Sequence, residues 1–219
     1  MSHPALRLTG RSSSHFTRVA RMFAHELNVP LEFAIVHDLT ALEAATFDGN
    51  PALKLPTLHV GPSPLFGTEN ICRRLIELAG RTADPRIVLP EYVTADLGRN
   101  AQEMVWHAMA AQVQLRMGLA LAKLSADNVF FTKIQAGMAG ALTWLETHLD
   151  QALALLPASR DVSLFEVTLF CLLEHIAFSS TLPLDRYIRL LRFASAFGER
   201  ESARRTSYRF DPRPDSAKA

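Results

Sequence analysis

Three consecutive serines lie where a predicted strand is followed by a predicted helix. They are Ser12, Ser13 and Ser14, in the stretch GRSSSHFTRV (10–19). Serine is a preferred N-cap residue, so one function of these hydroxyls is to cap the helix. Hydroxyls at a helix N-terminus are also well placed to stabilise an anion, because the free backbone N–H groups and the helix dipole favour negative charge there. The position of the serines therefore indicates either capping or anion binding.

The stretch KLPTLHV (54–60) places Pro56 inside a pattern that otherwise predicts a strand. Proline has no N–H for a ladder, so within a sheet it occurs at an edge, at the first residue or at a bulge. A bend at this point leaves the backbone of Leu55 unpaired by a neighbouring strand. That backbone can then form hydrogen bonds with another partner.

The stretch GTEN (67–70) is a turn that leads into a predicted helix. The carboxylate of Glu69 can bind an amine, and Asn70 together with the first helical N–H groups can hold a carboxylate. Each of the three stretches alone is weak evidence for a binding site. The three in this order are stronger evidence.

The first 80 residues contain the elements that must position these groups. Alternating apolar residues predict strands, and apolar residues at helical spacing predict helices. The predicted elements are a strand at 5–9, a helix at 15–27, a strand at 31–39, a strand at 56–60, a short strand at 65–67 and a helix at 69–79. This order, β-α-β followed by β-β-α, predicts a four-stranded mixed sheet with helices packed on it.

The rest of the chain has helical periodicity, and no convincing strand follows residue 90. Predicted helices cover 91–124, 127–155, 163–179 and 184–198. We therefore expect an α/β domain at 1–80, a linker at 81–90 and an all-helical domain at 91–219. Ser163 and Glu166 form an S-x-x-E capping box, which predicts a firmly started helix.

The composition is that of a globular protein with a real core. Of the 219 residues, 48% are hydrophobic and 21% are charged, and the formal net charge of +1 favours neither nucleic acid nor an anionic membrane. The basic stretch 200–213 is expected to be a solvated tail. The two cysteines, Cys72 and Cys171, have no metal-ligand or disulfide spacing, which indicates a reducing compartment. Neither a secretory signal nor a membrane span is recognised, so we expect a cytoplasmic protein without bound metal.

Taken together, these motifs resemble those of the cytosolic glutathione S-transferase family, and the resemblance covers nearly the whole chain. SSHFTRV resembles the active-site segment of the serine-type classes, in a zeta- or tau-like form and of a bacterial type. KLPTL resembles the family's V-P or I-P element, TEN resembles its E-S dipeptide, and SLFEV resembles its capping box. The resemblance implies a thioredoxin-like N-terminal domain joined to an all-α C-terminal domain.

The resemblance also implies roles for the three stretches. Pro56 is expected to be a cis proline, which presents the Leu55 backbone to the cysteinyl backbone of glutathione as an added strand would. Lys54 matches a position that pairs with the glycine carboxylate in some classes, and Glu69 and Asn70 would hold the γ-glutamyl end. Ser13 aligns with the thiol-activating serine, and Ser12 and Ser14 are close competitors.

Two absences narrow the class that the resemblance indicates. No tyrosine precedes Tyr92, which excludes the tyrosine-activated classes, and no cysteine precedes Cys72, which disfavours omega-like and beta-like chemistry. His15 stands where a zeta-like enzyme has cysteine, which argues against a maleylacetoacetate isomerase. Two departures from the family pattern are Asn70 in place of serine and Ser14 in place of proline.

The implied activity is conjugation of the glutathione thiolate to an apolar electrophile, as in detoxification, by a homodimer. The electrophile site is expected on the first long helix of the second domain, at Trp106, His107, Ala110 and Val113. An aromatic and Met-rich helix face is also typical of a core. The alternatives are a non-catalytic ligand-binding or interaction protein with the same fold, or a glutathione-dependent isomerase or reductase.

Overall fold

The structure is a computed structural model that describes residues 6–61 and 63–212. The chain divides into two compact units. The first unit contains the described residues up to Asp84 together with those from Arg200 onward, and the second contains Pro85–Glu199.

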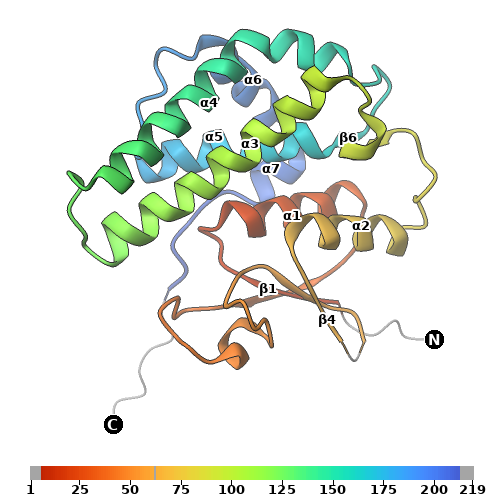
Figure 1. The fold of residues 1–219 in the computed structure, drawn as a ribbon. Coiled ribbons are helices and arrows are strands. Elements are labelled where there is room, and N and C mark those ends of the chain that lie inside the picture. Colours follow the sequence, from red (N-terminus) through yellow and green to blue (C-terminus); the bar gives the residue numbers. More distant parts are fainter. Residues whose placement is uncertain (1–5, 62, 213–219) are drawn as a thin grey trace. The chain divides into compact units, whose positions relative to one another are not determined.

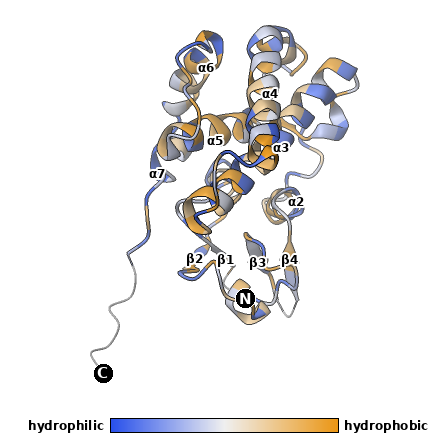
Figure 2. Ribbon diagram, turned by 60° about the vertical axis from the view of Figure 1, so that its left-hand side comes forward, coloured by the Kyte–Doolittle hydropathy of each residue, from blue (hydrophilic) through white to orange (hydrophobic). Residues whose placement is uncertain are grey.

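A four-stranded mixed sheet forms the centre of the first unit, with strand order β2-β1-β3-β4 (Figures 1 and 2). The strands are β1 (Arg7–Gly10), β2 (Glu32–Ile35), β3 (Thr57–His59) and β4 (Pro64–Phe66). β1 pairs parallel with β2 and antiparallel with β3, and β3 pairs antiparallel with β4. The predicted β-α-β unit and hairpin are therefore confirmed, although β2 is shorter than the predicted strand at 31–39.

Two helices of the first unit, α1 (His15–Glu26) and α2 (Thr68–Leu78), pack against the sheet and against each other (Figure 1). Both helices bury one apolar face, as their periodicity predicts. The residues of this core include Leu8, Val19, Phe23, Leu58, Ile71 and Leu75, all with no exposed surface. A short 3-10 helix, η1 (Ala44–Phe47), lies between the predicted strands at 31–39 and 56–60, where no helix was expected.

The C-terminal residues contradict the expectation of a solvated tail. Helix α7 (Glu201–Arg205) and the extended residues that follow it pack on α1, with Ala203, Thr206 and Asp211 buried. The basic character behind that expectation comes from arginines that are mostly exposed, whereas small or polar residues between them are buried. Arg213, the last residue of the predicted tail, lies outside the described residues.

The second unit is a helical bundle, as predicted. Its helices are α3 (Asp96–Leu115), which continues as the π-helix η3 (Arg116–Leu121), α4 (Val129–Ala154), α5 (Leu164–Ser179) and α6 (Ile188–Gly198), with a 3-10 turn η2 (Pro90–Tyr92) before them. Most residues of α5 are buried, which makes it the central helix of the bundle.

The expectation that no strand follows residue 90 is wrong in one detail. A two-residue strand at the predicted linker, β5 (Ile87–Val88), pairs parallel with β6 (Val162–Ser163). Two residues are too few to show an alternating pattern in the sequence. The pairing ties the segment predicted as a linker into the second unit.

The predicted capping box is confirmed at the start of α5. The Oγ atom of Ser163 accepts a hydrogen bond of 3.1 Å from the Glu166 backbone N–H. The carboxylate of Glu166 is held by the Arg160 guanidinium, with hydrogen bonds of 2.6 and 2.7 Å. This motif stabilises the central helix of the second unit and is not part of a candidate site.

Candidate functional site

The strand register of the first unit brings the three candidate stretches to one edge of the sheet. Thr9 of β1 lies opposite Thr57 of β3, and Thr57 lies opposite Phe66 of β4. Because β1 and β4 both run antiparallel to β3, they end at the same edge of the sheet, where β3 begins. The serines follow β1, the GTEN stretch follows β4, and Leu55–Pro56 precedes β3 at this edge. Helices α1 and α2 therefore both begin there.

A turn between β1 and α1 carries the three serines. The Ser14 N–H donates to the Arg11 carbonyl at 3.1 Å, which closes a turn with Ser12 and Ser13 as its central residues. Ser14 is the N-cap of α1, and its Oγ accepts from the Thr17 N–H at 3.2 Å. Ser14 therefore has the capping function, which is one of the two functions that the position of the serines indicates.

The remaining two serines differ in burial. Ser12 is 1% exposed, its Oγ has no hydrogen-bond partner among the described residues, and its N–H donates to Oδ2 of Asp211 at 2.8 Å. Ser13 is half-buried. We call residues 11–14 the serine turn. It presents Ser13 and Ser14 at partly open positions and turns Ser12 inward.

Gly10 allows the end of β1 to approach the first turn of α1. A Cβ at this position would overlap the Cγ2 and Oγ1 atoms of Thr17, which is itself fully buried. The serine turn therefore depends on a close contact between a glycine and a threonine on its two sides.

We expect Gly10→Ala to lower the free energy of unfolding by about 1–3 kcal/mol, because it overpacks this contact. Chemical denaturation measures the loss. Thr17→Ala should restore part of it, since it removes both overlapping atoms, and the Thr17 Oγ1 has no hydrogen-bond partner among the described residues. A Gly10→Ala variant as stable as the wild type would contradict this packing.

The Leu55–Pro56 peptide bond is cis, as the resemblance implies. Pairing of β3 begins at Thr57, so the Leu55 backbone lies outside the ladder. Asn50 braces the preceding loop, because its Nδ2 donates to the Lys54 carbonyl at 2.9 Å and its Oδ1 accepts from the Ala52 N–H at 3.0 Å. The Lys54 side chain is exposed.

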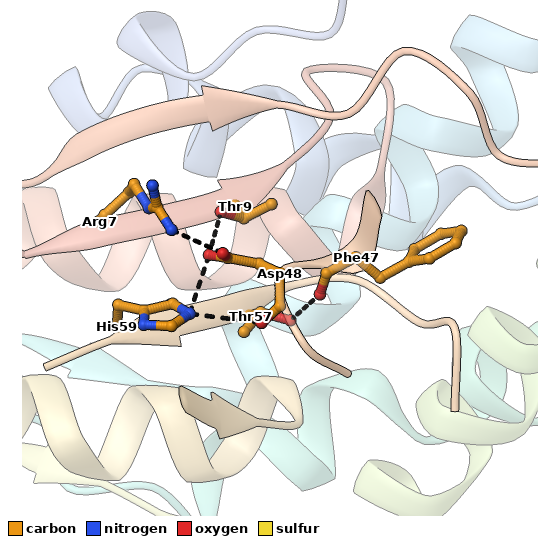
Figure 3. Close-up of polar contacts among 6 residues, drawn as sticks. All are labelled: Arg7, Thr9, Phe47, Asp48, Thr57 and His59. Carbon is orange, nitrogen blue, oxygen red and sulfur yellow. Dashed lines mark hydrogen bonds and ion pairs between the residues drawn. The ribbon is translucent and has the colours of Figure 1, made fainter. Parts of the chain in front are cut away.

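Asp48 fixes this loop to the sheet (Figure 3). Its carboxylate accepts hydrogen bonds from Arg7 at 2.6 Å and from the Thr9 hydroxyl at 2.7 Å, and it lies 3.1 Å from Nε2 of His59. Thr57 adds a hydrogen bond of 3.1 Å to the Phe47 carbonyl. The loop that delivers Leu55 and Pro56 is therefore held by both β1 and β3.

The GTEN stretch forms the first turn of α2. Glu69 is half-buried, and its Oε1 accepts a hydrogen bond of 2.6 Å from Arg73. Asn70 is exposed, and its Nδ2 donates to the Phe66 carbonyl at 3.1 Å. Both side chains thus have intramolecular partners at the end of the sheet where the candidate stretches meet.

The residues expected to receive an electrophile lie on α3 of the second unit. Trp106 and Val113 are half-buried, Ala110 is exposed, and the exposed His107 lies 3.3 Å from Glu103. Trp106, Ala110 and Val113 share one helix face because they are four and three residues apart. This face is not part of the core of the second unit.

Other site classes find no support in the described part of the chain. It contains no group of three or more His, Cys, Asp or Glu side chains arranged to hold a metal ion. None of its helices has the length and apolar character that crossing a bilayer requires.

Asp48, Asn50 and Asp211 are the site-forming residues that the sequence analysis missed. Asp48 and Asn50 lie between the predicted strands at 31–39 and 56–60, and both residue types favour local hydrogen bonds to the backbone. Asp211 lies 199 positions from its partner Ser12. No local pattern signals a contact over that separation.

Comparisons with known proteins give one family match, in the N-terminal part of the chain. Residues 8–83 match the family model described as "Glutathione S-transferase, N-terminal domain", and this range contains every candidate residue of the first unit except Asp211. No curated protein matches the sequence.

Similar solved structures extend the likeness to nearly the whole chain. A glutathione transferase family member from Pseudomonas fluorescens Pf-5, with bound glutathione, has a TM-score of 0.75 and 19% identity, covering 94% of this chain and 100% of its own. A glutathione S-transferase from Methylobacterium radiotolerans, in complex with glutathione sulfonate, has a TM-score of 0.74 and 16% identity, covering 96% and 99%. Glutathione S-transferase III in its apo form has a TM-score of 0.69 and 19% identity, covering 96% and 100%.

At these identities the likeness establishes the fold. The chain has the glutathione S-transferase fold, a thioredoxin-like unit joined to a helical unit, as predicted. The family match covers residues 8–83, and the structural neighbours share the fold over nearly the whole chain.

Proposed function

We propose that this protein is a glutathione S-transferase of the serine type, which binds glutathione in its first unit and conjugates its thiolate to an apolar electrophile. The observation that carries the proposal is the register Thr9–Thr57–Phe66, which brings the serine turn, Leu55–Pro56 and the start of α2 to one edge of the sheet. Two similar structures that contain glutathione or its sulfonate, and the family match over residues 8–83, support it.

In this proposal each stretch binds a different part of glutathione. The Leu55 backbone, which lies outside the ladder, pairs with the cysteinyl backbone. Glu69 binds the γ-glutamyl amine and Asn70 the adjoining carboxylate. A carboxylate accepts several hydrogen bonds, so the contact of Arg73 with Glu69 leaves capacity for an ammonium group. Lys54, which is exposed, pairs with the glycine carboxylate.

Ionisation of the thiol is the chemical step that the serine turn supports. A free cysteine thiol has a pKa of about 8.5, so little thiolate is present at neutral pH. A hydrogen bond donated by the Ser13 hydroxyl to the sulfur, together with the N-terminus of α1, favours the thiolate anion. The thiolate sulfur then forms a bond to the electrophilic carbon, and the leaving group departs with the electron pair of the broken bond. Trp106, His107, Ala110 and Val113 are the proposed contacts of the electrophile.

The test is an ultraviolet titration of the glutathione thiol with and without the protein. The proposal predicts that the pKa of the bound thiol lies about 1–2 units below that of free glutathione, as a charge-assisted hydrogen bond and a helix dipole allow. The proposal would be contradicted if the protein bound no glutathione at millimolar concentration, or if the pKa of the bound thiol were unshifted.

A non-catalytic ligand-binding or interaction protein is the second candidate function. It is favoured by the hydrogen bond of Asn70 to Phe66 and by the use of Ser14 as a cap, because both groups are already engaged. Normal glutathione binding without turnover of any electrophile in a panel would favour this candidate. A glutathione-dependent reductase is less well supported, since Cys72, in α2, is fully buried.

We also propose that the protein is a cytoplasmic homodimer. The dimer would pack mainly through α2 and α3, as the resemblance implies. Light scattering at micromolar concentration tests this assembly, and a monomeric mass would contradict it.

A further inference from the structure

The C-terminal segment 200–212 follows α1 along its whole length, in the opposite direction. At the C-terminal end of α1, Glu26 accepts hydrogen bonds of 2.8 and 2.7 Å from Arg200 and is also bound by the Ser202 hydroxyl. At the N-terminal end, Ser12 is bound by Asp211. We call this segment the C-terminal strap (Figure 1).

Arg18 of α1 joins the middle of the strap. Its guanidinium donates to the Ala203 carbonyl at 3.1 Å and to the Thr206 hydroxyl at 3.4 Å, and it lies 4.3 Å from the centre of the Tyr208 ring. Arg18 and Thr206 are both buried. The contacts at Glu26, Arg18 and Ser12 fix the strap at three levels of the helix.

The last of these contacts acts on the serine turn itself. The Asp211 side chain is 1% exposed, and its Oδ2 accepts from the Ser12 N–H at 2.8 Å. Ser12 is a central residue of the turn, and the next residue, Ser13, is the proposed thiol-activating group. A fixed Ser12 N–H therefore sets the orientation of the Arg11–Ser12 peptide, which lies one residue before Ser13 in the turn.

Positive charges surround this buried carboxylate. Arg209 lies 4.0 Å from Asp211, and Arg21 of α1 interacts electrostatically with both residues. Burial lowers the pKa of Arg21, and the Arg209 charge lowers it further, while Asp211 acts in the opposite direction. Two arginine side chains, Arg209 and Arg21, therefore lie near the carboxylate that accepts the hydrogen bond from the turn.

We infer that Asp211 is a positioning residue: through the Ser12 N–H it holds the serine turn in the shape that directs Ser13 toward the glutathione thiol. This inference rests on the proposed function. It assigns to the C-terminal strap a role in the reaction that goes beyond attachment of the chain end, because the buried Asp211 of the strap binds the turn directly.

The test compares two breaks in the same strap in the full chain. Asp211→Ala removes the contact with the turn, and Arg200→Ala removes the two hydrogen bonds at the far end. We expect Asp211→Ala to lower kcat/KM about tenfold and to raise the pKa of the bound thiol, while Arg200→Ala changes kcat/KM less than about twofold. Asp211→Asn, which keeps an acceptor oxygen, should retain most of the activity.

A second readout separates this inference from the proposed function. Hydrogen exchange of the amides in residues 10–15 needs no glutathione, and we expect faster exchange there in Asp211→Ala than in the wild type or in Arg200→Ala. Glu201→Gln, which removes an exposed carboxylate of α7, serves as the charge-matched control for Asp211→Asn. If wild-type protein fails to bind glutathione, the proposed function fails, while the exchange result still tests the contact.

The inference is overturned if Asp211→Ala leaves the exchange of the turn or the pKa of the bound thiol unchanged. It is also overturned if Arg200→Ala lowers kcat/KM as much as Asp211→Ala, because the strap would then act only through stability. If kcat/KM of Asp211→Asn is as low as that of Asp211→Ala, the inference is likewise overturned, because a retained acceptor oxygen would then make no difference.

Discussion

Replacement of Ser13 by alanine is expected to lower kcat/KM for glutathione conjugation by about ten- to a hundredfold. A hydrogen bond to a charged group contributes about 1.5–3 kcal/mol, and its loss in the transition state converts to this range of rates. The pKa of the bound thiol should rise in the same variant, since the hydroxyl no longer stabilises the anion. Steady-state kinetics across a pH series measure both effects.

The neighbouring serines supply the controls for this experiment. Ser12→Ala should change the activity little, because the Ser12 hydroxyl is buried and has no hydrogen-bond partner among the described residues. Ser14→Ala should lower the free energy of unfolding by about 1 kcal/mol through the loss of the α1 cap. An unchanged kcat/KM in the Ser13→Ala variant would contradict the assignment of Ser13. A large loss of kcat/KM in Ser14→Ala alone would transfer the thiol-activating role to Ser14.

Replacement of Arg18 by alanine is expected to lower the free energy of unfolding by about 2–4 kcal/mol, through lost packing of a long buried side chain and lost hydrogen bonds. Arg18 is 2% exposed and holds the middle of the C-terminal strap. Urea denaturation followed by circular dichroism measures the loss. Limited proteolysis should also cleave the strap faster, because it has lost its central attachment.

An arginine on the surface of α2 provides a matched control. The Arg74 side chain is 40% exposed and pairs with Glu77 at 2.7 Å. Arg74→Ala should lower the free energy of unfolding by less than about 0.5 kcal/mol, since ion pairs at the surface contribute little to stability. If Arg18→Ala is no more destabilising than Arg74→Ala, the strap is not anchored through Arg18.

Local sequence patterns were sufficient to predict most of the elements. The apolar spacing of α1 and α2, the hairpin of β3 and β4 and the capping box at Ser163 are all local features, and each is present in the structure. Their order then determined the architecture, because a β-α-β unit followed by a hairpin and a helix has few compact arrangements. The two-residue strands β5 and β6 carry no such pattern and were missed.

The residues that hold the candidate site in place were harder to predict from the sequence than the residues that would bind a ligand. The serines, Leu55–Pro56 and Glu69 have residue types that indicate binding, but nothing in the sequence pairs Asp211 with Ser12. Asp48 likewise connects to Arg7 and His59 only through the folded sheet. Arginine-rich composition suggested solvation of the strap, whereas its few buried residues determine where it packs.

A crystal structure of the protein with glutathione bound is the most direct test of the site. The account predicts that the sulfur lies within hydrogen-bond distance of the Ser13 hydroxyl while the cysteinyl backbone pairs with Leu55. Glutathione bound elsewhere, or a sulfur that faces none of the three serines, would contradict it.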